Sequence, residues 1–248
     1  MKTAVILAGG KGLRLYPDNE GAAKPMVIIN GRPILEYIIL MLQRLGFETL
    51  YVIVGYKKEV IMDYFRQGRG YGLDIHYIEN SHIDDPRKNG LSDALLLVKD
   101  IINEPFMTIL GDEIYADTRH KEMLVLFENS QRYEAMIAVY RAQNIEEVKK
   151  NYSVKVDDEL VVLDLEEKPL KPWNDLVGCG TYLFRPSIFG YIEKTEISPR
   201  TFRRELADTL KLIVEDGKIL KAFDIKGRYL NITYPADLDY AKKILGGA

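Results

Sequence analysis

The sequence has little chemistry for disulfides or structural metals, with one cysteine, three histidines and one tryptophan in 248 residues. A single cysteine cannot form an internal disulfide, so we expect a reducing compartment. Cys179 lies in the apolar run 177–184 and is expected to be a small buried residue. The histidines at 76, 82 and 120 are scattered and have no cysteine pair beside them, so they do not predict a zinc site.

The sequence also lacks an excess of one charge and a long hydrophobic run. Its 34 basic and 37 acidic residues give a net charge of −3 and are spread along the chain. Without a basic tail or stripe we expect no nucleic-acid or membrane partner. No apolar run approaches the roughly 20 residues that span a bilayer, and Met1 leads directly into an apolar segment without a signal-like leader. We therefore expect a cytoplasmic protein.

Apolar segments and helical patterns alternate along the first half of the chain. Strands are predicted at 3–7, 49–54, 74–78 and 106–110, and helices at 33–45, 58–65 and 91–101. This alternation predicts an α/β fold whose sheet is largely parallel and binds ligands at the carboxyl ends of its strands.

The second half is richer in strands. The predicted order is helix 121–129, strand 135–140, a hairpin of 153–156 with 160–165, strand 177–184, helix 202–215, strand 219–223 and helix 235–245. No linker, repeat or low-complexity tract interrupts the chain, so one domain covering 1–248 is predicted.

A glycine-rich loop follows the first predicted strand. Its nucleotide-binding positions are Leu7, Ala8, Gly9, Gly10 and Gly12. The glycines allow a tight turn whose N–H groups point at anionic oxygens. Arg14 can clamp phosphate with two hydrogen bonds, and Lys24 is expected to be an exposed, mobile cation of the loop.

Two common nucleotide loops do not match this segment. A P-loop requires Gly-Lys-Ser/Thr, whereas Lys11 precedes Gly12, and a dinucleotide fingerprint requires a small residue at the position of Leu15. The pattern Gly-Gly-x-Gly-x-Arg-Leu-x-Pro, followed by Lys24-Pro25-Met26, resembles the signature of sugar-1-phosphate nucleotidyltransferases. The resemblance runs in matching order from Met1 to about the final helix. It implies a Rossmann-like three-layer α/β/α fold with a mostly parallel central sheet and a smaller β-rich sugar-binding part.

Acidic residues follow the predicted strand 106–110. Asp112 comes after a single glycine and can bind Mg²⁺ bridged to triphosphate oxygens. For Glu113 and Asp117 two interpretations stay open. Each belongs to this site or is an ordinary solvated side chain. The segment around Asn231 resembles the one that carries the family's second metal ligand, which is more usually aspartate. The resemblance implies that the Asn231 carbonyl coordinates Mg²⁺ with Asp112, and the alternative is a turn residue before the last helix.

Three further segments resemble substrate-binding segments of the family. Asn89 and Gly90 open the predicted helix 91–101, where the backbone would contact the base, and the alternative is a capping turn. The implied sugar-phosphate-binding residues are Tyr152, Ser153, Glu167, Lys168, Asn174, Gly180 and Tyr182. Ser153 stands where many members have glycine, which puts the identity of the sugar in doubt. Residues 1–117 would form mainly the nucleotide-binding half, and 118–248 mainly the sugar-phosphate-binding half.

The implied reaction joins an NTP and a sugar 1-phosphate to give an NDP-sugar and pyrophosphate, with Mg²⁺ as cofactor. Arg14, Lys24, Asp112 and Lys168 are the implied catalytic residues, and glucose 1-phosphate with dTTP or UTP is the first substrate pair to consider. Two alternatives stay open, namely a catalytically silent subunit that binds nucleotide sugars and a cytidylyltransferase for a non-sugar alcohol phosphate. The sequence holds no hexapeptide repeats, so we expect no acyltransferase domain. The oligomeric state is open, with a homo-oligomer as one alternative.

Overall fold

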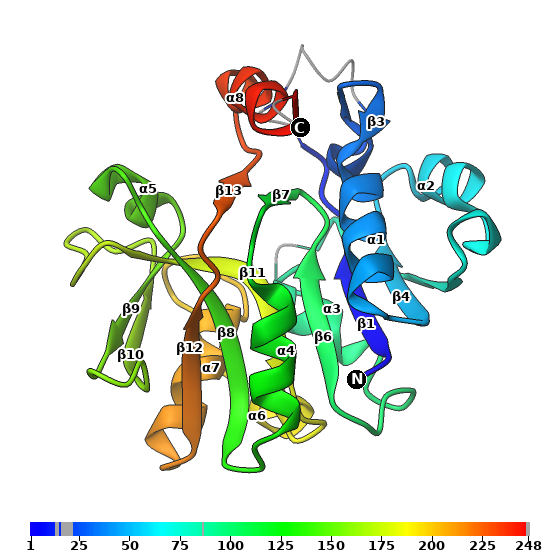
Figure 1. The fold of residues 1–248 in the computed structure, drawn as a ribbon. Coiled ribbons are helices and arrows are strands. Elements are labelled where there is room, and N and C mark those ends of the chain that lie inside the picture. The colour runs from blue at the N-terminus through cyan, green and yellow to red at the C-terminus, as the bar shows by residue number, and fades with distance from the viewer. Residues whose placement is uncertain (13–14, 16–21, 86, 247–248) are drawn as a thin grey trace. The chain divides into compact units, whose positions relative to one another are not determined.

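A computed structural model describes residues 1–12, 15, 22–85 and 87–246 of the chain (Figure 1). Arg14 lies outside these residues, so its predicted role has no structural description. The chain divides into two compact units. We call residues 2–83, 109–118 and 227–248 the N-terminal unit, and Met1 with residues 84–108 and 119–226 the central unit. No helix in the described part of the chain is both long and apolar enough to cross a membrane.

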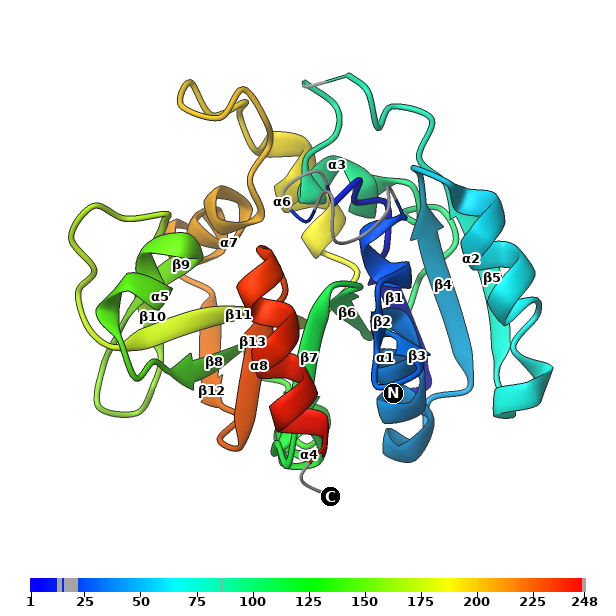
Figure 2. The same cartoon turned by 90° about the horizontal axis from the view of Figure 1, so that it is seen from above.

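The N-terminal unit contains a parallel sheet of β1 (Thr3–Leu7), β4 (Thr49–Val54) and β5 (Asp74–Glu79). Helix α1 (Ile34–Leu45) covers one face of β1 and β4 (Figures 1 and 2). The helix buries Ile34, Ile38 and Leu42 at helical spacing, which is the pattern of an amphipathic helix on a core. Gly46 ends it in the left-handed conformation, as is common after a helix.

The unit contains further helices and strands. They are η2 (Lys24–Met26), β2 (Ile28–Ile29), β3 (Arg32–Pro33), α2 (Lys58–Phe65), η3 (Arg69–Tyr71), β7 (Glu113–Ala116), β13 (Arg228–Asn231) and α8 (Pro235–Gly246). β7 and β13 form an antiparallel pair, and so do β2 and β3.

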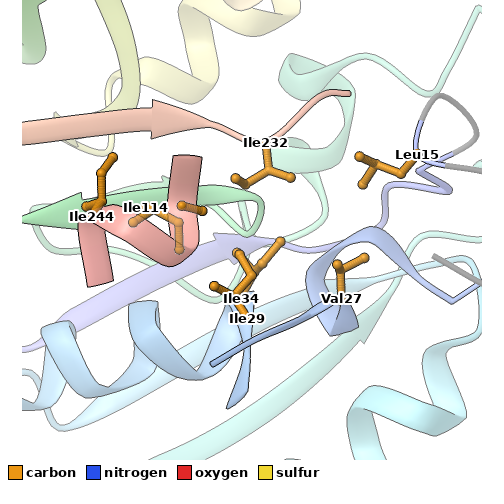
Figure 3. Close-up of a cluster of buried hydrophobic side chains, with 8 residues drawn as sticks. Leu15, Val27, Ile29, Ile34, Ile114, Ile232 and Ile244 are labelled. Atoms are coloured by element: carbon orange, nitrogen blue, oxygen red, sulfur yellow. The ribbon is translucent and has the colours of Figure 1, made fainter. Parts of the chain in front are cut away.

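A buried hydrophobic cluster holds several of these elements together (Figure 3). Its members come from four separated parts of the sequence and are Leu15, Val27, Ile29, Ile34, Ile114, Ile232, Ala241 and Ile244. Burial of each large aliphatic side chain stabilises the fold by roughly 2 kcal/mol. The cluster therefore fixes η2, β7, β13 and α8 beside one another, although none of them is long enough to be stable alone.

The central unit is built around β8 (Tyr133–Arg141). β8 pairs antiparallel with β11 (Leu176–Phe184) and parallel with β12 (Ile219–Asp224). β9 (Tyr152–Val156) and β10 (Val162–Glu167) form a hairpin that continues from β11. β6 (Phe106–Leu110) runs from this unit into the N-terminal unit.

Helices cover both faces of this central sheet. α4 (His120–Glu128) lies on one face, and α6 (Ile188–Lys194) and α7 (Leu206–Glu215) lie on the other (Figures 1 and 2). α3 (Leu91–Leu96) and α5 (Ile145–Lys150) complete the unit. All nine residues of β11 are buried, which explains its continuous apolar sequence.

Most predicted elements are present, including the 153–165 hairpin and the buried Cys179. Two predicted helices are shorter than expected. α3 ends at Leu96 because the following N–H groups bond three residues back, as from Leu97 to Ala94, in tighter turns. α7 begins at Leu206 and not at Phe202, because Phe202 has a φ of 59° that a helix does not accept. β7, β13, α5 and α6 were not predicted.

The central sheet generates a prediction at Gly178 in β11. A Cβ at this position would overlap the ring of Tyr152, whose hydroxyl donates to the Cys179 carbonyl at 3.2 Å. Gly178→Ala should therefore lower the free energy of unfolding by about 2 kcal/mol, measured by denaturant unfolding. Gly190→Ala is the control, because an added Cβ there meets nothing within 4 Å, and alanine in helix α6 should be neutral or stabilising by up to about 1 kcal/mol. Equal stability of Gly178→Ala and the wild type would contradict the packing of Tyr152 on this glycine.

Candidate functional site

The glycine loop leaves β1 at its carboxyl end, as predicted. Leu7 and Ala8 are buried, and the Ala8 N–H donates to the Ile53 carbonyl of β4 at 2.8 Å. Gly9 and Gly10 are partly or fully exposed beyond this point. Gly12 has a φ of 66°, a conformation that favours glycine. The loop backbone therefore emerges from the sheet at an edge where parallel strands commonly bind ligands.

Lys24 is buried, which corrects the expectation of an exposed, mobile cation. Lys24 as a whole is 8% exposed, and its side chain forms an ion pair with Asp112. Its backbone N–H donates to the Gly10 carbonyl at 3.2 Å, which closes the glycine loop onto η2. The short helix is held by Val27 in the hydrophobic cluster, and this packing positions the ammonium group.

Asp112 is positioned by Gly111 at the end of β6. The Gly111 N–H donates to the Leu7 carbonyl at 2.9 Å, and a Cβ at 111 would come within 3.2 Å of Ala8. Glycine permits this close approach to the end of β1. The Asp112 carboxylate is therefore held beside the start of the glycine loop, together with the Lys24 ammonium.

Asn231 is the last residue of β13, and Asp112 directly precedes β7. The Ile232 N–H donates to the Asp112 carbonyl at 3.1 Å, so the two strands bring these residues to the same end of the pair. The Asn231 Oδ1 accepts a hydrogen bond from the Thr233 hydroxyl at 3.1 Å. A carboxylate and an amide carbonyl are oxygen ligands of the kind that Mg²⁺ takes. In the part of the chain that the structure describes, no three His, Cys, Asp or Glu side chains gather to hold a metal.

The two open acidic residues have different surroundings. Glu113 is only 1% exposed and accepts hydrogen bonds from the hydroxyls of Tyr115 and Tyr229, so it is not a solvated side chain. Asp117 is exposed and pairs with Arg228 at 2.5 Å, which matches the solvated alternative. The burial of Glu113 had no signal in the sequence, because its tyrosine partner in β13 lies 116 residues away.

In the central unit, Glu167 and Lys168 form the turn at the end of β10. Lys168 has a φ of 46°, and its N–H donates to the Asn151 carbonyl at 2.7 Å. Its side chain is 55% exposed, and Nζ lies 3.4 Å from Oε1 of Glu167. Arg200, which sequence reasoning missed, donates to the carbonyls of both Glu167 and Lys168. Three hydrogen bonds thus hold the backbone of this turn, and the Lys168 ammonium group is accessible to solvent.

Glu167 is a half-buried acid, since its side chain is 19% exposed. Desolvation raises its pKa to about 7, and the nearby Glu205 adds to the rise, while Lys168 and Arg200 oppose it. A carboxyl group that titrates near neutral pH is common at functional sites. Its proton state decides whether it donates or accepts a hydrogen bond.

The other predicted sugar-phosphate residues lie close to this hairpin in the same sheet. Tyr182 stacks between Tyr152 and Phe184, with ring centroids 6.5 and 5.6 Å apart. Ser153 is fully buried, and its Oγ accepts from the Trp173 N–H at 3.3 Å.

Asn174 and Gly180 extend the same group of residues. Asn174 donates to the Val154 carbonyl and accepts from the Leu176 N–H, both at 2.9 Å, and so fixes the chain before β11. Gly180 is buried within β11.

Asn89 and Gly90 also belong to the central unit. Gly90 precedes α3, and a Cβ there would overlap the Arg204 carbonyl. Arg204 in turn pairs with Asp93 of α3 at 2.5 Å. Close packing against the Arg204 backbone thus requires glycine at position 90. The contact of Gly90 with a nucleotide base stays a prediction.

Comparison with known proteins identifies the family. A family model described as Nucleotidyl transferase matches residues 3–233. The chain is 37% identical to the bifunctional protein GlmU of Methanocaldococcus jannaschii over 98% of this chain and 54% of that protein. It is 34% identical to the UTP–glucose-1-phosphate uridylyltransferase AglF of Haloferax volcanii over 98% of this chain and 96% of that protein. The chain thus spans about half the length of the GlmU relatives that it matches.

Solved structures agree at the level of the fold. A putative glucose-1-phosphate thymidylyltransferase from Bacillus anthracis, in complex with a sucrose, has a TM-score of 0.88 at 22% identity. That match covers 100% of this chain and 96% of the other. A UDP-glucose pyrophosphorylase complexed with UDP-glucose has a TM-score of 0.86 at 22% identity, covering 99% and 98% of the two chains.

The chain belongs to the nucleotidyl transferase family, and its relatives place it among the sugar-1-phosphate nucleotidyltransferases. The predicted family and the Rossmann-like α/β fold are therefore confirmed.

The raised pKa of Glu167 gives a prediction on stability. A carboxyl whose pKa is about 7 in the folded state and near 4.5 when unfolded holds its proton more tightly when folded. The free energy of unfolding should therefore fall as pH rises from about 4.5 through 7, by up to about 3 kcal/mol. Glu167→Gln should remove this fall, measured by denaturant unfolding at pH 5 and pH 8. The exposed Glu159→Gln is the control, and an unchanged pH dependence in Glu167→Gln would contradict the assignment.

Proposed function

We propose that the chain transfers a nucleotidyl group from an NTP to a sugar 1-phosphate, giving an NDP-sugar and pyrophosphate. The observation that carries this proposal is the ion pair of the buried Lys24 with the half-buried Asp112 beside the glycine loop. A cation and a carboxylate held together at the end of a parallel sheet suit a metal-bound triphosphate, which needs both charges. Family membership supports the class of reaction.

The N-terminal unit binds the phosphates of the NTP in this proposal. Backbone N–H groups of Gly9, Gly10 and Gly12 face the phosphates, and Arg14, assigned from sequence, steadies the leaving pyrophosphate. Lys24 stabilises the oxygens of the α-phosphoryl group as charge builds on them. Asn89 and Gly90, also assigned from sequence, contact the base.

Asp112 and Asn231 would hold Mg²⁺. The donor set fits this ion, because Mg²⁺ usually takes one or two protein oxygens and completes its shell with water and substrate phosphates. When bound, it supplies neutralisation of phosphate charge and holds the triphosphate in one orientation.

The central unit binds the sugar 1-phosphate. Lys168 holds the phosphate, and Glu167 accepts hydrogen bonds from sugar hydroxyls when ionised. Tyr152, Ser153, Asn174, Gly180 and Tyr182 shape the surface around the sugar. A phosphate oxygen of the sugar attacks the α-phosphorus in line, a new P–O bond forms, and the bond to the bridging oxygen of pyrophosphate breaks. The lysines position two anions that repel each other, so no covalent enzyme intermediate is needed.

For the substrates we propose glucose 1-phosphate with UTP or dTTP. The name of AglF, which matches over nearly its whole length, supports UTP and glucose 1-phosphate. A catalytically silent subunit and a cytidylyltransferase for another alcohol phosphate are the alternatives. We also propose a cytoplasmic location, with no nucleic-acid or membrane partner.

A screen of pyrophosphate release tests the function. Each common NTP is combined with a panel of sugar 1-phosphates and Mg²⁺, and the product is identified by mass spectrometry. We expect release that needs both substrates and is fastest with UTP or dTTP and glucose 1-phosphate. No release with any pair would support the silent subunit, and release with CTP and a non-sugar alcohol phosphate would support the cytidylyltransferase.

Lys24 gives a prediction on turnover. Lys24→Ala should lower kcat by about 10²- to 10³-fold, or about 3 kcal/mol in the barrier, because one contact to developing charge is lost. Steady-state pyrophosphate release measures this. The substitution also removes the ion-pair partner of Asp112 and can lower stability. The free energy of unfolding of the same variant is therefore measured as the control. Wild-type kcat in this variant would remove Lys24 from the reaction.

Lys168 gives a prediction that separates the two substrates. Lys168→Ala should raise KM for the sugar 1-phosphate at least about tenfold and leave NTP affinity nearly unchanged, because this exposed lysine is assigned to the sugar's phosphate. Calorimetry with each substrate separately measures the split. Lys171→Ala, three residues along the same loop, is the control. An equally large loss of NTP affinity would contradict the division between the units.

A further inference from the structure

Glu113 is a buried carboxylate that the proposed reaction does not use. It begins β7, is 1% exposed, and each of its two oxygens accepts one tyrosine hydroxyl. The Tyr229 hydroxyl donates to Oε1 at 2.7 Å, and the Tyr115 hydroxyl donates to Oε2. Both carboxyl oxygens therefore have a hydroxyl donor, and these two contacts fix the orientation of the side chain.

The pairing of β7 with β13 places Glu113 directly opposite Asn231. The neighbouring pair, Asp112 with Ile232, is joined by the backbone hydrogen bond from the Ile232 N–H. Because hydrogen-bonded and non-hydrogen-bonded pairs alternate in an antiparallel ladder, Glu113 and Asn231 form a non-hydrogen-bonded pair. Side chains in such pairs lie on the same face and approach closely, with Cα atoms about 4.5 Å apart.

This position matters because the proposed metal ligands carry little net negative charge. Asn231 is neutral, and the Asp112 carboxylate is shared with the Lys24 ammonium. A divalent cation gains from a negative charge nearby even without direct contact, and the gain is larger where protein screens the charge from water. Glu113 has both properties, since it is buried and adjoins Asn231 across the strands.

We propose that Glu113 is a positioning residue that supplies the second negative charge of the metal site from behind Asn231. The two tyrosine hydroxyls hold the Glu113 carboxylate in place, and of the opposed pair Glu113 and Asn231 only Asn231 presents an oxygen to the cation. This inference rests on the metal site of the proposed function.

The test measures metal affinity directly, by electron paramagnetic resonance of Mn²⁺ with the protein alone and with UTP. Glu113→Gln keeps the shape and removes the charge, so it should weaken Mn²⁺ binding about tenfold. Tyr229→Phe is the matched control, because it removes one hydrogen bond to the same carboxylate and keeps the charge. It should weaken binding by less than about threefold. Equal Mn²⁺ affinity of Glu113→Gln and wild type would overturn the proposal, and so would an equal loss in both variants.

A rescue variant separates charge from packing. Glu113→Gln combined with Asn231→Asp moves the carboxylate across the strand pair and keeps the formal charge of the site. It should recover most of the Mn²⁺ affinity lost in Glu113→Gln. No recovery of Mn²⁺ affinity in the double variant would overturn the proposal.

Asn231→Asp alone covers the case in which Glu113→Gln does not fold. It puts two carboxylates opposite each other, which repel without a cation. Its melting temperature should fall, and saturating Mn²⁺ should raise it by several degrees more than in wild type. A melting temperature without Mn²⁺ equal to that of the wild type would show no repulsion from Glu113 across the strand pair and would overturn the proposal.

The outcomes also separate this inference from the proposed function. Mn²⁺ binding that depends on Glu113 in a protein that releases no pyrophosphate would count against the reaction only. Pyrophosphate release by a protein whose Mn²⁺ affinity is the same with and without the Glu113→Gln substitution would count against this inference only.

Discussion

The antiparallel pairing of β7 with β13 is the constraint on which the N-terminal unit's candidate site depends. It joins segments that are more than a hundred residues apart and sets Asn231 beside Asp112 and opposite Glu113. Each strand has four residues, so the pair is too short to be stable alone. Its stability comes from Ile114 and Ile232, which pack into the same cluster as Val27 next to η2. The packing of aliphatic side chains thus sets the spacing of the charged groups.

The two units contribute different kinds of groups. The N-terminal unit holds its cation by burial and by an ion pair, so Lys24 is fixed before any substrate binds. The central unit presents Lys168 on an exposed turn whose backbone, and not its side chain, is fixed. A fixed charge suits a reacting centre, since it costs no reorganisation there, and an exposed charge suits capture of an anion from solution.

The sequence predicted the fold where elements are long and regular. β4 and α2 have the predicted bounds, because a buried apolar run and an amphipathic stripe are local signals. It failed for β7 and β13, whose stability comes from distant partners, and for the start of α7, where Phe202 adopts a positive φ. At the site, local motifs indicated Lys24, Asp112 and Lys168. The burial of Lys24 and of Glu113, and the contacts of Arg200, depend on tertiary packing that no local pattern carries.

The ion pair between Lys24 and Asp112 has a consequence for which anions the loop attracts. An ammonium already paired with a carboxylate draws a passing anion less strongly than a free one does. A lone phosphate or chloride ion gains little from displacing Asp112, because it leaves that carboxylate without a partner. A phosphate that arrives with its own cation satisfies both groups together. If the loop binds phosphate as proposed, this ion pair makes it bind simple anions such as chloride more weakly than an unpaired lysine would.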